Sequence, residues 1–176
     1  MASSSLDALF GVDQQPLSLE SFIEGLSEGL AWASVDLQPG EYLHTEGSIL
    51  SQIAHVANGK IIYGSVGFRD TEVRWRELSP KIDSLWPNLD AIVNWLFEAH
   101  DYWMNSWTEV DDLDCNRLRF DGSQLPGWKL VATIIHHDHY HAGQIHLQRA
   151  ILAPSSAPPP QEGVLWEEYC KNFPSW

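Results

Sequence analysis

The sequence has few cysteines, no long apolar run and no basic residue near its start. Its two cysteines, Cys115 and Cys170, are far apart, and neither has a cysteine or histidine at metal-ligand spacing, which argues against a zinc knuckle or a redox pair. No stretch approaches the roughly 18 apolar residues that a membrane span requires. The first ten residues, MASSSLDALF, lack the basic residues of a secretory signal. We therefore expect a cytoplasmic protein with reduced thiols.

Positive charge is also scarce. The chain has 10 basic and 24 acidic residues, which gives a formal net charge of −14. Because a surface of this sign repels phosphate backbones and anionic lipid heads, nucleic acids and membranes are not expected partners. Apolar residues are plentiful, at 44% with nine tryptophans, and 176 residues suffice for one domain with a buried core.

Hydrophobic periodicity predicts four main helices, so that an all-α four-helix bundle is the expected fold class. The helices are expected at about residues 18–32, 47–67, 88–110 and 126–152. Residues 71–86 predict a shorter helix or a turn-rich connection that is broken near Pro80.

Two regions outside these helices have a distinctive composition. Asp111, Asp112 and Asp114 invite a calcium interpretation, but the glycine and closing glutamate of an EF-hand loop are missing, so a solvated loop is expected. The APSSAPPP segment predicts a stiff linker, and the apolar residues of the tail VLWEEYCKNFPSW predict a short helix that docks back. We expect residues 1–153 to form a metal-binding bundle and residues 154–176 to form the linker and docking tail.

Five of the eight histidines lie in the segment HHDHYHAGQIH, residues 136–146. A rotation of about 100° per residue places His137 and His141 on the same helical stripe as the apolar Leu130 and Ile134. The other three histidines of the segment fall on the opposite or lateral faces: His136, His139 and His146. Two histidines are therefore expected to point into the bundle.

His137 and His141 are four residues apart, so their rings stack one helical turn apart and can reach one metal ion. The helical HExxH motif of zinc proteases uses this spacing, but no glutamate follows His137 and Asp138 projects about 100° away. A peptidase is therefore not expected. A buried, neutral pair hydrogen-bonded to Tyr140 or Gln144 is the alternative.

A catalytic zinc usually takes three protein ligands, so a third must come from elsewhere in the chain. The candidates are His44, His55, His100, Glu41, Glu46 and Glu98. Among them His55 is favoured by a narrow margin, because it shares a helical line with small and polar residues that could wall a polar cavity, including Gln52 and Gly59. His100 lies about 80° from the apolar stripe of its own helix, so it is expected at the bundle edge.

Two segments, SQIAHVANGK in the second expected helix and HDHYHAGQIHLQRAIL in the last, resemble the DinB/YfiT-like family of metalloenzymes. The resemblance covers about residues 19–152, and HxxxHxGQI is its specific part. It implies an up-down-down-up four-helix bundle with a three-histidine metal site at one end. Carried over by position, the ligands are His55, His137 and His141. Many relatives have arginine where this chain has Ala142, so a positive group is expected to be missing from the site rim.

Relatives in this family include transferases and isomerases that use low-molecular-weight thiols. The resemblance thus implies a metal-dependent, thiol-dependent S-transferase or isomerase with a small-molecule substrate. The sequence does not reveal the oligomeric state, and a homodimer is the assembly to test. A metal-dependent hydrolase and a non-enzymatic metal- or ligand-binding bundle remain alternatives. Imidazole suits zinc, nickel, copper and iron, with zinc and nickel as the first expectations. No catalytic acid or base is identified, and the weak candidates are Glu98, Tyr140 and Gln144.

Overall fold

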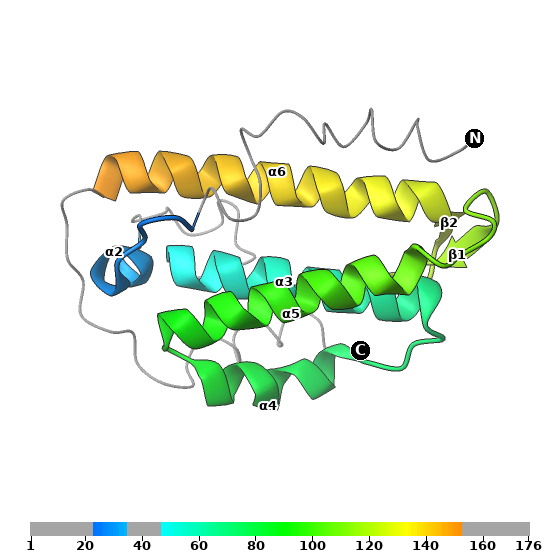
Figure 1. The fold of residues 1–176 in the computed structure, drawn as a ribbon, viewed down its shortest axis with the longest axis horizontal. Helices are drawn as coiled ribbons and strands as arrows, with labels where there is room; N and C mark the ends of the chain where they lie inside the picture. The colour runs from blue at the N-terminus through cyan, green and yellow to red at the C-terminus, as the bar shows by residue number, and fades with distance from the viewer. Residues whose placement is uncertain (1–22, 35–46, 153–176) are drawn as a thin grey trace.

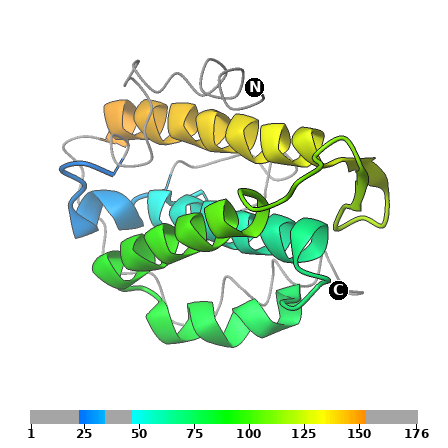
Figure 2. The ribbon, with the colours of Figure 1, turned by 45° about the vertical axis from the view of Figure 1, so that its right-hand side comes forward.

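The computed structural model describes residues 23–34 and 47–152, and within them the chain is a helical bundle. The helices are α2 (Glu28–Trp32), α3 (Ile49–Phe68), α4 (Trp75–Leu85), α5 (Leu89–Trp107) and α6 (Gly127–Leu152). The views in Figures 1 and 2 show the long helices α3, α5 and α6 running alongside one another, with α4 on the side of the bundle away from α6. The expected all-α bundle is confirmed. Within residues 23–34 and 47–152, every helix is either too short or too polar to be a membrane span.

Some expectations fall on residues outside this description. They are the Ser18 start of the first helix, the 154–176 linker and tail, Cys170, and the alternative ligands Glu41, His44 and Glu46. The first helix expected at residues 18–32 is wrong over residues 23–27, which form a turn with Gly25 at a φ of +66° and then the Ser27 cap, so that helix α2 begins only at Glu28.

Helix α3 occupies the centre of the bundle. It begins after Ser48, whose Oγ accepts a hydrogen bond from the Ser51 N–H at 3.1 Å. All its residues except Tyr63 and Phe68 are buried, and it packs most extensively against α5 and then against α6. A helix with apolar residues on every side must be enclosed by its neighbours, which explains this central position.

Helix α5 presents the apolar stripe that the sequence predicts. Asn88 caps its start, with Oδ1 accepting from the Ala91 N–H at 2.9 Å. The stripe residues are all buried: Ile92, Leu96, Ala99, Trp103 and Trp107. Helix α5 packs most extensively on α3, and Trp103 and Trp107 at its C-terminal end also cluster with Val131 and Ile134 of α6.

The break expected at Pro80 is wrong, because α4 continues through this residue. Proline removes the hydrogen bond to the carbonyl four residues earlier, that of Arg76. Arg76 and Pro80 are both exposed, so water can satisfy that carbonyl. Leu78 and Ile82 are buried in the main core and hold the opposite side of α4 against the bundle.

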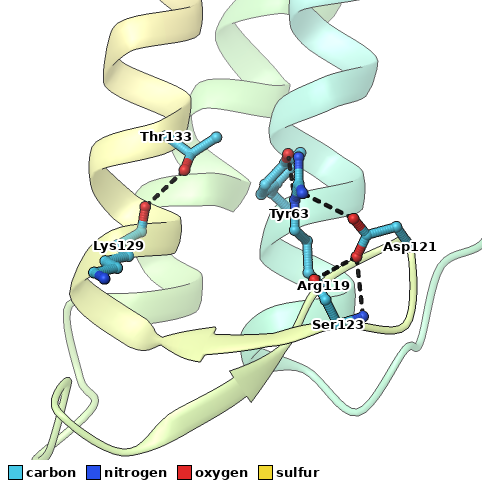
Figure 3. Close-up of polar contacts among 6 residues, drawn as sticks. All are labelled: Tyr63, Arg119, Asp121, Ser123, Lys129 and Thr133. Carbon is cyan, nitrogen blue, oxygen red and sulfur yellow. Dashed lines mark hydrogen bonds and ion pairs between the residues drawn. The ribbon is translucent and has the colours of Figure 1, made fainter.

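A small hairpin, which the sequence did not predict, precedes α6. Strands β1 (Asn116–Leu118) and β2 (Gln124–Pro126) pair antiparallel, with Arg117 opposite Leu125. Figure 3 shows how the turn is held: the Arg119 guanidinium pairs with Asp121 at 2.8 Å, and its Nε donates to the Tyr63 hydroxyl of α3 at 3.4 Å. The preceding aspartates are exposed, as expected for a solvated loop.

Candidate metal centre

The histidines of α6 divide between the inside and the outside of the bundle, as the helical rotation predicts. His141 is buried, with 2% of its surface exposed, and His137 is half-buried. The other three are exposed: His136, His139 and His146. The local helical geometry therefore selects one pair of this histidine-rich segment for the interior.

His55 of α3 meets that pair. Its Nε2 lies 2.9 Å from the Nε2 of His137, and its ring centroid lies 4.9 Å from those of both His137 and His141. The centroids of His137 and His141 are 4.5 Å apart. One ligand nitrogen from each residue can be chosen so that all three lie within 4.8 Å of one another. We call these three residues the histidine triad.

The donor set and spacing of the triad fit a divalent ion. An ion bound to imidazole lies about 2.0–2.1 Å from each nitrogen, which in tetrahedral geometry separates the nitrogens by about 3.3 Å. The distance between the Nε2 atoms of His55 and His137, 2.9 Å, is shorter than this separation, and the upper limit for the three nitrogens, 4.8 Å, is longer. Small ring rotations would bring the nitrogens to the expected separation. Two helices supply the three rings, and the group contains no carboxylate within the described ranges. The triad could thus hold one ion through neutral ligands.

Of the alternative ligands, His100 and Glu98 lie in the described residues, and neither joins the triad. His100 is half-buried on α5, where the charges of Lys60 and Asp138 act on it. Glu98 is exposed on the same helix. Among the described candidates, the packing of α3 against α6 brings His55 alone to the pair.

One side of the triad is close to the protein surface. The ring of Tyr140 contacts that of His141 at a centroid distance of 5.1 Å, and Tyr140 is 44% exposed. Its hydroxyl accepts a hydrogen bond from Gln144 Nε2 at 2.9 Å. Two of the weak catalytic candidates therefore lie together on α6, at the edge of the site.

Ala142 does not lie at a site rim, contrary to expectation. It is fully buried in the main core. One step along α6 turns it about 100° from His141 and into the packed interior. Position 142 is therefore a core position, so the positive group that was expected to be missing from the site rim has no place at the rim in this structure.

Sequence reasoning missed a buried ion pair beside the triad. Lys60 of α3 pairs with Asp138 of α6, and the Lys60 side chain is completely inaccessible to solvent. Burial lowers the pKa of Lys60 and raises that of Asp138, while the charge of each partner opposes the shift in the other. The available signal was that Lys60 is the one Lys, Arg, Asp or Glu residue of α3.

A second buried polar bridge joins the same two helices. Gln52 of α3 donates through Nε2 to Oε1 of Gln148 in α6, and Gln148 Nε2 donates to the Gly47 carbonyl at 2.6 Å. Gln52 lies three residues before His55, and Gln148 lies seven after His141, so each glutamine shares a helical face with a triad histidine. Along α3, these polar contacts to α6 therefore lie on both sides of His55.

Comparison with known proteins identifies one family. A sequence model of the DinB family matches residues 23–148, a range that includes all three triad residues. No curated protein and no solved structure gives a match.

Proposed function

The chain belongs to the DinB family, and from this membership and the triad we propose that it is a metal-dependent enzyme in which His55, His137 and His141 bind one divalent ion. The observation that carries the proposal is the convergence of three imidazoles from α3 and α6 in the bundle interior. Zinc and nickel are the ions that we propose first, because both accept imidazole ligands. Three protein ligands also leave a coordination position for a substrate.

We propose further that the substrate is a low-molecular-weight thiol that the enzyme transfers to a small electrophile. A bound divalent ion would supply Lewis acidity and favour the thiolate over the thiol. The triad residues are neutral ligands, so they leave the charge of the ion available to an anion. The neighbouring carboxylate of Asp138 is engaged by Lys60, so it is poorly placed to act as the general base of a hydrolase. Tyr140, exposed beside His141, lies where a substrate would approach.

Replacing each triad histidine by alanine tests the metal site. Each variant should bind zinc or nickel at least about tenfold more weakly, because even the loss of a residue that only supports a ligand costs this much. His139→Ala and His146→Ala are matched controls on the exposed side of α6 and should bind like the wild type. Protein purified without an affinity tag is titrated with each ion by calorimetry. Equal losses in His139→Ala and His137→Ala would contradict the proposed ligands.

The reaction is tested separately with the metal-loaded protein. Thiol addition to the nickel- or cobalt-loaded protein should produce a thiolate-to-metal charge-transfer absorption that His141→Ala lacks. A panel of thiols and electrophiles should then reveal thiol-dependent turnover. Hydrolysis of esters or amides without any thiol would favour the hydrolase alternative. Saturable thiol binding with no turnover across the panel would favour a binding protein.

A further inference from the structure

The ion pair between Lys60 and Asp138 is unusual in its degree of burial. Lysine is almost never fully buried, and removing two charges from water costs several kcal/mol per ion before their attraction is counted. Lys60 nevertheless has no exposed surface, and the Asp138 side chain is 20% exposed. A pair of apolar residues would fill this space without that cost. The pair therefore calls for an explanation other than stability of the fold.

The position of the ion pair relative to the triad suggests that explanation. Gly59 precedes Lys60 on α3, and a Cβ built on Gly59 would lie 3.4 Å from Cε1 of His137. The ring of His137 thus lies against the backbone of Gly59, while the next residue, Asp138, binds the next residue of α3, Lys60. Two consecutive residues of one helix meet two consecutive residues of the other.

Such a contact defines the rotation and the axial position of α6 relative to α3. A shift of one residue along α6 would rotate its side chains by about 100° and move them about 1.5 Å along the axis. The rotation would turn Asp138 away from Lys60 and leave the charge of Lys60 buried without its partner. The same change would turn His137 away from Gly59 and from the Nε2 of His55. The ion pair and the histidine contact hence require the same arrangement of the two helices.

We propose that Lys60 and Asp138 are positioning residues for the histidine triad. Their ion pair holds the rotation and register of α6 against α3, and so keeps His137 directed at His55. This inference rests on the proposed metal site, but neither Lys60 nor Asp138 is among its proposed ligands. Its function is to arrange the imidazoles before the ion binds.

The test is the double variant Lys60→Met/Asp138→Leu in the full-length protein. It removes both charges together and leaves no buried charge without a partner, so the metal-free protein should unfold at the same or a higher urea concentration than the wild type. Its dissociation constant for zinc should rise about 10- to 100-fold, the usual effect of losing a group that orients a ligand. The cobalt absorption bands, which report coordination geometry, should also change.

Two control variants accompany it. Arg119→Met/Asp121→Leu removes the ion pair at the hairpin turn, which lies near Tyr63 at one end of α3 (Figure 3). This variant should bind zinc like the wild type. Asp138→Glu retains the charge pair and should bind zinc nearly as well as the wild type. Recovery by this conservative change would show that the charge pair, rather than the packing volume, positions the triad.

The outcomes separate this inference from the proposed function. Weaker zinc binding with unchanged stability supports the positioning role. Wild-type affinity in Lys60→Met/Asp138→Leu overturns it and leaves the metal site intact. A parallel fall in affinity and stability also overturns it, because the pair would then support only the fold. Failure of the wild type to bind zinc, nickel or cobalt overturns the proposed function and this inference together.

Discussion

At the scale of single residues, His100 is half-buried and lies among charged side chains. Burial lowers its pKa, and the charge of Lys60 on α3 lowers it further, while Asp138 on α6 and Asp101 on α5 act in the opposite direction. The folded state therefore binds this proton less readily than the unfolded chain, in which histidine has a pKa of about 6.5. The resulting stability is fully present above pH 6.5 or so and is lost as the pH falls below it.

We predict that His100→Gln weakens the dependence of stability on pH in acid solution. Urea unfolding of the metal-free protein is measured between about pH 7.5 and pH 5, across the unfolded pKa of histidine. The free energy of unfolding should fall less for His100→Gln than for the wild type, because the variant has no group here to protonate. His146→Gln, which changes an exposed histidine of α6, should follow the wild type. Superimposable curves for wild type and His100→Gln would show that His100 contributes nothing.

At the scale of helices, two glycines within helices have opposite surroundings. A Cβ on Gly64 of α3 would lie 2.8 Å from Ser106 Oγ and 3.0 Å from Tyr102 Cε1, both on α5. A Cβ on Gly143 of α6 would meet nothing within 4 Å. Gly64 thus permits the close approach of α3 and α5, whereas Gly143 has no packing role that a methyl group would disturb.

We predict that alanine has opposite effects at these two positions. Gly143→Ala should stabilise the protein by about 1 kcal/mol, because alanine favours a helix over glycine by this amount. Gly64→Ala gains the same preference but overpacks the α3–α5 contact at a cost of about 1–3 kcal/mol, so a net loss is expected. Chemical denaturation of both variants measures the difference. Stabilisation by Gly64→Ala would mean that α5 moves aside at little cost.

At the scale of the whole molecule, the triad links two helices that are far apart in the sequence. His55 and His137 are separated by 82 residues, so the unfolded chain does not hold the site together. An ion that binds the folded state alone stabilises it by about 2.7 kcal/mol at 100 times the dissociation constant. The core, in contrast, is built from apolar residues of α3, α4, α5 and α6 and does not depend on the ion.

We predict that removing the metal lowers stability without unfolding the protein. After chelation, far-ultraviolet circular dichroism should remain dominantly helical, while the thermal midpoint should fall and recover when zinc is added back. The triple variant His55→Ala/His137→Ala/His141→Ala should show no such response. A chelated protein without helical structure would identify the metal as part of the fold rather than a ligand of a preformed site.

The features that the sequence alone determined are those that depend on local periodicity. The apolar stripe of α5 and the division of the α6 histidines both follow from 3.6 residues per turn, and the structure confirms both of them. Periodicity can assign a side chain to a face because a helix repeats regularly from one residue to the next. It cannot say what lies opposite that face.

The tertiary structure decided which groups from different helices meet. It brought His55 to the α6 pair and left His100 beside Lys60 and Asp138, although local patterns favoured His55 only narrowly. It also paired Lys60 with Asp138, residues 78 positions apart, which no local pattern connects. Their meeting depends on the rotation and register with which α3 and α6 pack. Those are set by side-chain packing summed over the whole core, so contacts between distant residues become definite only when the complete bundle has formed.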